Sequence, residues 1–403
     1  MNGMTIGEML RACRGEWQGT EETLAKAPSS IVTDSRQAGE GSLFLALRGE
    51  KTDGHKYISD VLQKGALAVL CEERGAAGEP RIVVPDTLAA MQQIAAASRK
   101  RWDIPFVGVT GSVGKTTTKE VCYAGLSAFG KTLKTEGNQN NDIGVPNTLF
   151  RLDNDTEYAV VEMGMDHAGE IERLTRCARP SAGIITMIGV SHLENLGTRE
   201  NILKAKMEIC TGLPDGAPLV LNADNDLLPT ADVPTRLKAV WFGIDAENAD
   251  VRAVDVETGT NGTTFKIIDK EYGTFDAAIP TAGVHTVYDA LAAYAAATRL
   301  GLDAARCAAA LATYQTTGMR QHIVKKGGVT FIEDCYNASP DSMKAALSVL
   351  KALPNARKIA LLGDMLDNRQ SQTGSSSLLG TTFVHPVKPF KYPVLMSSGD
   401  SDA

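Results

Sequence analysis

The stretch FVGVTGSVGKTTTKE, residues 106–120, decides the fold of the central part of this chain. An apolar run ends at Thr110, a turn with two glycines follows, and the residues after Gly114 are compatible with a helix. A buried strand that turns through glycines into a helix N-terminus presents backbone N–H groups and the positive end of the helix dipole to a polyphosphate. In such a loop Lys115 reaches the terminal phosphates and the Thr116 hydroxyl ligates Mg²⁺. The stretch therefore predicts a strand–loop–helix unit that binds a nucleoside triphosphate.

The loop follows the shortened pattern T-G-x-x-G-K-T-T, because Val109 stands where the longer phosphate-loop pattern has its first glycine. A glycine-rich turn without a ligand is the alternative, and the strand–turn–helix context argues against it. The residues expected to surround the phosphates are Gly111, Ser112, Val113, Gly114, Lys115, Thr116 and Thr117.

The composition is that of a soluble globular protein of two or three domains, with 403 residues, 43% hydrophobic and 22% charged. A net charge of -7 without a basic run argues against a nucleic-acid partner. The seven cysteines are scattered without a C-x-x-C pair, which is typical of reduced thiols and not of a disulfide framework or a zinc site. Because no apolar stretch has the length of a signal core or a membrane span, we expect a cytoplasmic protein without membrane insertion.

Periodicity divides the chain into an N-terminal module, a central domain, a shorter third unit and a tail. Residues 1–85 carry short strand-like runs around a helical segment, which predicts a small α/β module. In residues 86–318 apolar strands alternate with helices, as in a parallel sheet covered on both faces. Residues 319–366 begin a further α/β domain with a strand, an amphipathic helix and a strand. Residues 367–403 are rich in Ser, Thr, Gly and Pro and are expected to form a disordered tail.

Polar side chains follow the apolar strands of the central domain, at the sheet edge where ligands of such sheets bind. Glu162 ends one strand and suits a Mg²⁺ ion shared with Thr116, although a solvated strand-end acid is the alternative. His192 follows another strand, and both a structural and a ligand role remain open for it. The amide-rich residues 135–146 suit substrate hydrogen bonding or a polar turn. Lys206 lies in a helical pattern, and from the residues alone it is expected to be solvated.

Seven motifs occur in the order in which the Mur ligases of bacterial peptidoglycan synthesis have them, and the chain resembles that family. They are TGSVGKTT at 110–117, TEGNQNNDIGVP at 135–146, VVEMGM at 160–165, IGVSHLE at 188–194, KAKMEI at 204–209, GMRQ at 318–321 and EDCYNASPDSM at 333–343. In the N-terminal zone, TDSR at 33–36 and RGEKTDGH at 48–55 resemble the segments with which the family grips a UDP-sugar.

The resemblance implies an α/β fold of three domains and an ATP-dependent amide ligation. The domains are a small N-terminal UDP-sugar domain, a central parallel-sheet ATPase domain with the phosphate loop, and a C-terminal Rossmann-like domain that is incomplete here. ATP would convert the free carboxylate of UDP-N-acetylmuramoyl-tripeptide to an acyl phosphate, and the amine of D-alanyl-D-alanine would attack it. The resemblance further implies ATP and Mg²⁺ as cofactors and a monomeric enzyme.

The resemblance also implies roles for individual residues. Lys115, His192 and Lys206 would be catalytic, and Lys206 would become carbamylated and act as a metal ligand. The implied metal ligands are Thr116, Glu162, His192 and Lys206. From the third domain, Arg320 and Asp334 would reach ATP, and Tyr336 and Asn337 would shape the adjoining strand end. Asn138 and Asn141 would line the substrate site. Ser35 and Arg36 would contact the UDP-muramoyl group.

Two departures from the family pattern lead to further expectations. The family has H-N-x-x-N beside the adenine site, whereas Thr286 and Asp289 occupy the two amide positions here, and an aspartate cannot donate a hydrogen bond as asparagine does. Family-like sequence ends near Leu366, as after a shifted reading frame or in an incomplete gene. We therefore expect impaired catalysis, because the surface that docks D-alanyl-D-alanine would be largely absent.

Two alternatives to this function remain. A folylpolyglutamate synthetase-like amide ligase would share the central domain, but the TDSR and DGH segments of the N-terminal zone argue against it. A nucleotide-binding remnant without turnover is favoured only by the tail. The sequence does not decide whether the third residue of the acceptor tripeptide is lysine or diaminopimelate.

Overall fold

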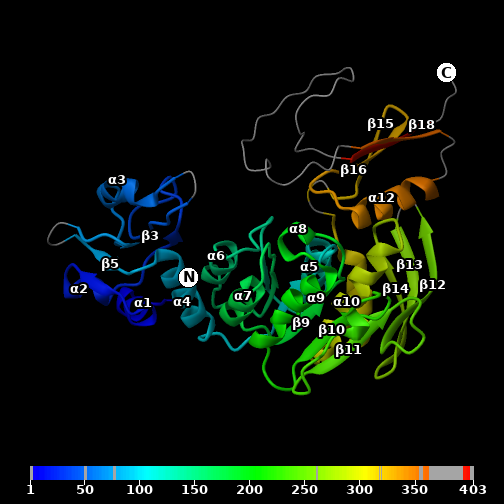
Figure 1. Ribbon diagram of the computed structural model, residues 1–403, viewed down its shortest axis with the longest axis horizontal. Coiled ribbons are helices and arrows are strands. Elements are labelled where there is room, and N and C mark those ends of the chain that lie inside the picture. The colour runs from blue at the N-terminus through cyan, green and yellow to red at the C-terminus, as the bar shows by residue number, and fades with distance from the viewer. Residues whose placement is uncertain are drawn as a thin grey trace.

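The computed structural model describes residues 3–49, 52–75, 79–259, 262–316, 318, 320–353 and 357–362, together with the backbone of residues 394–399. Figure 1 shows three units in chain order, with the N-terminal unit in blue at one end and the C-terminal elements in orange at the other side. No helix in these described ranges is long and apolar enough to cross a membrane.

The N-terminal unit is a five-stranded sheet with strand order β1-β5-β4-β3-β2. Strands β2 to β5 pair in parallel, and β1 is antiparallel to β5. The elements are α1 (Ile6–Cys13), β1 (Glu16–Gln18), α2 (Glu21–Leu24), β2 (Ile31–Val32), β3 (Leu43–Leu45), α3 (Ile58–Gln63), β4 (Ala68–Cys71) and β5 (Arg81–Val83). Helix α1 begins with a capping box, in which Thr5 and Glu8 bond each other's backbone N–H groups.

The central unit is a nine-stranded sheet with strand order β14-β13-β12-β11-β10-β9-β6-β8-β7. Its strands are β6 (Phe106–Thr110), β7 (Thr132–Lys134), β8 (Tyr158–Glu162), β9 (Ala182–Ile185), β10 (Pro218–Asn222), β11 (Lys238–Gly243), β12 (Val251–Gly259), β13 (Gly262–Asp269) and β14 (Gly273–Ile279). Its helices are α4 (Thr87–Arg99), α5 (Lys115–Ser127), α6 (Gly144–Phe150), α7 (Glu170–Ala178), α8 (Leu193–Leu196), α9 (Arg199–Met207), α10 (His285–Arg299) and α11 (Ala304–Ala310).

Both faces of the parallel part of this sheet are covered, as the continuous apolar strands predict. Phe106 of β6 belongs to the hydrophobic cluster on the α4, α6 and α7 side, whereas Val107 and Val109 belong to the cluster with α5 and α10. Strand β6 lies in the middle, parallel to β8 on one side and to β9 on the other. This central position puts the end of β6 at the point where the sheet binds its ligand.

The edge of the central sheet differs from the expected alternation of strands and helices. Strands β12, β13 and β14 follow one another as antiparallel hairpins, and β13 alternates buried and exposed residues. Such alternation is typical of a strand with one solvated face, which a search for continuous apolar runs overlooks.

One hydrophobic cluster joins the N-terminal and central units. It contains Met9 of α1, Leu70 of β4, Met91 and Ile94 of α4 and Leu149 of α6. Helix α4 packs against α1 on one side and against α6 and α7 on the other. The connection between the two units is therefore a shared core and not a free linker.

The C-terminal unit is a four-stranded sheet with order β15-β16-β18-β17 and one helix. Its elements are β15 (His322–Lys326), β16 (Val329–Asp334), α12 (Pro340–Ala352), β17 (Arg357–Leu361) and β18 (Val394–Gly399). Ile332 packs against Val349 and Leu350 of α12, and Ala282 of the central unit joins this cluster.

The expected tail, residues 367–403, lies outside the described residues except for β18. Strand β18 pairs antiparallel with both β16 and β17, within the segment for which a disordered tail was expected. The paired residues lie between 34 positions (Leu361 and Leu395) and 70 positions (Val329 and Gly399) apart in the chain, and local composition carries no signal of such long-range pairing.

Candidate functional site

The phosphate loop joins β6 to α5 and needs glycine at two positions. Gly111 has φ 149° and Gly114 has φ 86°, which glycine adopts without strain. A Cβ at Gly111 would stand 1.8 Å from Thr186 Oγ1, and one at Gly114 would stand 2.9 Å from Asp289 Oδ1. The backbone of the loop therefore packs closely against Thr186, which follows β9, and against Asp289 of α10, and the Ser112 N–H donates to Met187 O at 2.9 Å.

Lys115 is the first residue of α5 and folds back over the loop. Its Nζ donates to the carbonyl oxygens of Gly111 at 2.8 Å and Ser112 at 3.3 Å. Loss of hydration lowers the pKa of Lys115, and the nearby Glu162 carboxylate opposes this shift. Ser112 Oγ is buried and has no hydrogen-bond partner among the described residues. The loop thus offers an ammonium group and an unused hydroxyl to an incoming anion.

Glu162, the last residue of β8, is held in place beside the loop. Its Oε1 accepts hydrogen bonds from Thr116 Oγ1 at 3.2 Å and from Asn140 Nδ2 at 2.8 Å. Its Oε2 is buried without a hydrogen bond from the described residues, and Lys119 Nζ stands 3.8 Å away. An ionised oxygen without a donor, next to a hydroxyl, is suited to a hard cation.

His192 and Lys206 are the two remaining expected catalytic residues. His192 has φ 65° as the residue before α8, and its Nδ1 lies 2.9 Å from Asp166 Oδ1. Burial lowers the pKa of His192, and the charge of Asp166 opposes this. Lys206 of α9 is 1% exposed, and loss of hydration lowers its pKa well below the usual value. The expectation of a solvated Lys206, drawn from the residues alone, is wrong.

The loop, Glu162 and His192 border one cavity of about 530 Å³. It is lined by the phosphate-loop residues Ser112, Val113, Gly114, Lys115 and Thr116, by the amides Asn138, Asn140 and Asn141, and by Glu162, Asp166, Glu170 and His192. The C-terminal unit contributes Arg320, Tyr336, Asn337, Ser339 and Ser342. The loop, the amide-rich segment and the C-terminal unit, which lie far apart in sequence, therefore converge on the same space.

Six of the expected site residues do not line this cavity. Gly111 and Thr117 belong to the loop and the first turn of α5, Lys206 is buried in α9, Asp334 ends β16, and Ser35 and Arg36 lie in the N-terminal unit. Burial raises the pKa of Asp334, against the charge of Arg320, and the Arg320 guanidinium stacks 4.5 Å from the Tyr336 ring.

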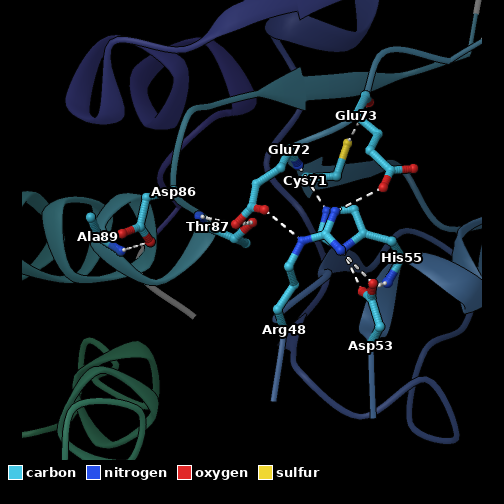
Figure 2. Close-up of polar contacts among 9 residues, drawn as sticks. All are labelled: Arg48, Asp53, His55, Cys71, Glu72, Glu73, Asp86, Thr87 and Ala89. Atoms are coloured by element: carbon cyan, nitrogen blue, oxygen red, sulfur yellow. Dashed lines mark hydrogen bonds and ion pairs between the residues drawn. The ribbon is translucent and has the colours of Figure 1, made fainter. Parts of the chain in front are cut away.

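The two segments expected to bind a UDP-sugar, residues 33–36 and 48–55, each form ion pairs. Arg36 pairs with Asp34 at 2.6 Å, which lowers the pKa of Asp34 to about 2. In Figure 2 the Arg48 guanidinium lies among three carboxylates, at 2.6 Å from Asp53, 2.7 Å from Glu72 and 2.8 Å from Glu73.

Figure 2 also shows how this segment is connected to α4. His55 Nδ1 lies 2.7 Å from Asp53 Oδ1, and its Nε2 accepts from the Glu72 N–H at 2.9 Å. Glu72 Oε1 in turn accepts from the backbone N–H of Thr87, the first residue of α4, at 3.2 Å. Leu88, the next residue, lines the cavity. Hydrogen bonds through Glu72 therefore link the 48–55 segment to Thr87, which is the chain neighbour of the cavity residue Leu88.

The two positions that depart from the family pattern serve internal contacts. Thr286 Oγ1 donates to Gly283 O at 2.8 Å, and Asp289 Oδ1 accepts from Thr118 Oγ1 at 2.6 Å. Both side chains are buried, and burial raises the pKa of Asp289 to about 7. Neither residue lines the cavity.

Three residues of the site were not among those expected from the sequence. Asn140 lies inside the quoted amide-rich segment, but only its neighbours were selected. Asp166 directly follows the VVEMGM motif, and its acidic side chain near His192 was a usable signal. Lys119 lies inside the opening stretch, where a lysine in a polar helical segment gives no sign of burial.

A metal cage built of protein side chains alone is absent from the described ranges. Three or more His, Cys, Asp or Glu side chains do not gather there in a way that suits a metal ion. A cation at Glu162 would therefore need further oxygens, which the phosphates of a bound nucleotide can provide.

Comparison with known proteins gives matches along most of the chain. Residues 29–99 match the model of the Mur ligase family, catalytic domain, residues 109–297 the Mur ligase middle domain, and residues 319–384 the Mur ligase, glutamate ligase domain. The last match extends past residue 366, where family-like sequence was expected to end.

Two curated relatives carry the name UDP-N-acetylmuramoyl-tripeptide–D-alanyl-D-alanine ligase. The protein of Bacillus subtilis is 40% identical over 84% of this chain and 73% of its own length. The protein of Escherichia coli is 36% identical over 91% of this chain and 80% of its own length.

Solved structures agree with these sequence matches. MurF from Acinetobacter baumannii superposes with a TM-score of 0.80 at 33% identity, covering 87% of this chain and 76% of that one. MurF ligase from Thermotoga maritima in complex with ADP has a TM-score of 0.74 at 28% identity, covering 81% and 75%. A folylpolyglutamate synthase from Mycobacterium tuberculosis, at 15% identity and a TM-score of 0.54, shares the fold alone. The predicted three-domain α/β architecture is confirmed.

Proposed function

Because the chain belongs to the Mur ligase family, we propose that its cavity joins D-alanyl-D-alanine to UDP-N-acetylmuramoyl-tripeptide with the use of ATP. The observation that carries this function is the convergence of the phosphate loop, the amide-rich segment and the C-terminal unit on one cavity. Relatives of this name match 84% and 91% of the chain. The product is the UDP-muramoyl-pentapeptide of peptidoglycan synthesis, and we place the reaction in the cytoplasm, where ATP and nucleotide-linked precursors are available.

The residues of the loop align and activate the phosphoryl donor. The Lys115 ammonium and the N–H groups at the start of α5 bind the terminal phosphates of ATP, and Arg320 approaches from the C-terminal unit. A carboxylate oxygen of the tripeptide attacks the γ-phosphorus, ADP leaves, and an acyl phosphate forms. The amine of D-alanyl-D-alanine then attacks the carbonyl carbon, loses a proton, and inorganic phosphate departs. Enclosure between the units protects the acyl phosphate from water.

The orphaned oxygen of Glu162 fits a Mg²⁺ ion. Thr116 and Glu162 would hold this ion beside the ATP phosphates, and His192 with Lys206 would hold a second. When bound, Mg²⁺ neutralises the charge of the triphosphate. Burial lowers the pKa of Lys206 and so favours the neutral amine, which is the form that reacts with carbon dioxide to give a carbamate. With ¹³C-bicarbonate, a carbamate NMR signal is expected in the native protein and not in Lys206→Arg; equal signals would contradict this assignment.

Among the expected substrate residues, Asn138 and Asn141 line the cavity, and their amides suit the peptide part of the acceptor. Ser35 and the exposed Arg36 would contact the UDP-muramoyl part from the N-terminal unit. The departures at Thr286 and Asp289 leave the loop intact, because both side chains are directed to internal contacts.

The test is phosphate release by the purified protein with ATP, UDP-N-acetylmuramoyl-tripeptide and D-alanyl-D-alanine. Release is expected to require all three, with a product whose mass equals the tripeptide nucleotide plus the dipeptide minus water. Lys115→Met is expected to abolish both signals. Phosphate release that does not depend on D-alanyl-D-alanine, or ATP binding without formation of the product, would contradict the proposed function. Parallel assays with the lysine-containing and the diaminopimelate-containing tripeptide nucleotides show which of the two the enzyme uses as its acceptor.

A further inference from the structure

We propose that Lys119 acts as an internal counter-ion that keeps divalent cations off Glu162 until a nucleotide has bound. This inference rests on the proposed Mg²⁺ site, and it adds an order of binding to it. Lys119 is a positioning residue, because it acts through Glu162 and does not line the cavity.

Lys119 is fully buried, which is rare for a lysine and requires partners. It lies one turn after Lys115 in α5, and its Nζ donates to Thr135 O at 2.9 Å. The same ammonium lies 3.1 Å from Glu120 Oε1 and 3.8 Å from Glu162 Oε2. The latter is the oxygen that lacks a hydrogen bond and was assigned to the cation. The ammonium thus faces the very atom that a metal would use.

The charges around Lys119 form a row of alternating sign. Lys134 pairs with Glu120 Oε2, Glu120 pairs with Lys119, and Lys119 faces Glu162. This row of two ammonium groups and two carboxylates is neutral as a whole. Buried ions are tolerated when such pairing compensates them, and an added charge is not compensated.

A divalent cation on Glu162 disturbs this balance in the absence of a nucleotide. It would face the Lys119 ammonium across the carboxylate, and repulsion between like charges is strong where water is excluded. A bound nucleotide brings several negative phosphate charges to the loop and offsets both cations. Lys119 therefore favours the entry of the metal with or after the nucleotide.

The position of Thr135 supports a role for Lys119 at this site and not only in the core. Thr135 O accepts from Lys119, and Thr135 Oγ1 accepts from the backbone N–H of Glu162 at 3.0 Å. Lys119 and the end of β8 are thus fixed to the same residue. The distance between the ammonium and the carboxylate is therefore set by the fold.

The experiment measures Mn²⁺ binding by electron paramagnetic resonance, with and without ADP, in the intact protein and in Lys119→Met. The native protein is expected to bind Mn²⁺ tightly only with ADP. Lys119→Met is expected to bind Mn²⁺ without ADP at least about tenfold more tightly than the native protein. Lys134→Met, which removes an equal charge that pairs with Glu120, is the matched control, and its affinity is expected to change less than about threefold.

Unchanged or weaker Mn²⁺ binding by Lys119→Met without ADP would overturn the inference. Glu120→Gln gives an independent test if the methionine variant does not fold, because Lys119 then keeps Glu162 as its remaining carboxylate. Several-fold weaker Mn²⁺ binding in its ADP complex supports the proposal, and unchanged binding overturns it. If the native protein with ADP binds no Mn²⁺, the metal site itself is refuted. Tight binding by the native protein in both states refutes only the role of Lys119.

Discussion

Asp289→Asn is expected to stabilise the protein, and to do so more at high pH than at low pH. The Asp289 carboxyl is buried beneath the phosphate loop and accepts one hydrogen bond, from Thr118. Burial raises its pKa from 3.8 to about 7. Asparagine has the same shape, keeps an oxygen for Thr118 and carries no ionisable group.

The size of the effect follows from the pKa in the folded and unfolded states. Below about pH 4 the carboxyl is neutral in both states and costs nothing. As the pH rises towards 7, the unfolded chain releases the proton and the folded protein retains it, so the free energy of unfolding falls. At about 1.4 kcal/mol per pKa unit, the loss is about 2 kcal/mol at pH 5 and reaches about 4 kcal/mol above pH 7. Asp289→Asn removes this loss.

The assay is urea unfolding of the native protein and of Asp289→Asn at pH 5 and pH 8, followed by tryptophan fluorescence. Trp102 and Trp241 report on the central unit. Asp276→Asn, at an exposed position of β14, is the control and is expected to shift stability equally at both pH values. A gain for Asp289→Asn that is equal at pH 5 and pH 8, or a loss at pH 8, would refute the reasoning.

Three further predictions concern the loop, a buried ion pair and the segment of Figure 2. Gly111→Ala places a Cβ 1.8 Å from Thr186 Oγ1, so ATP affinity measured by calorimetry is expected to fall by about ten- to hundredfold, and native affinity would contradict the role of this glycine. Arg299→Met leaves the fully buried Asp269 without its partner at 2.8 Å and is expected to lower the free energy of unfolding by about 3–5 kcal/mol. Adding Asp269→Asn should recover much of this loss, and no recovery would count against the ion pair as its cause. Arg48→Met breaks half-exposed ion pairs, so the free energy of unfolding at low salt should fall slightly and the difference from the native protein should shrink in 1 M salt, whereas a salt-independent change would speak against an electrostatic origin.

Local features of the site could be predicted from the sequence. The strand, turn and helix of residues 106–120 follow from an apolar run, two glycines and a helix-compatible segment, and the structure has β6, the loop and α5 at these positions. The place of Glu162 at the end of β8, and that of His192 in the loop after β9, follow from the same pattern, because parallel strands end at one edge of the sheet.

Contacts between distant segments could not be predicted in this way. Asp289 was noted as a departure, but its partner Thr118 lies 171 positions away. The composition of residues 135–146 indicated an amide-rich segment. The backbone conformation of this segment, however, decides that Asn140 and not Asn138 reaches Glu162. Lys119 looks like any helical lysine, because its burial depends on α5 packing against β7 and β8.

The shared core of the N-terminal and central units has a consequence for how such genes can be recombined. A crossover between related genes near residue 100 would pair α1 and α4 from one parent with α6 and α7 from another and mismatch that core. A crossover near residue 318 would divide a small cluster to which the central unit contributes Ala282 among the described residues. Functional chimaeras should therefore inherit the first two units together and exchange the third.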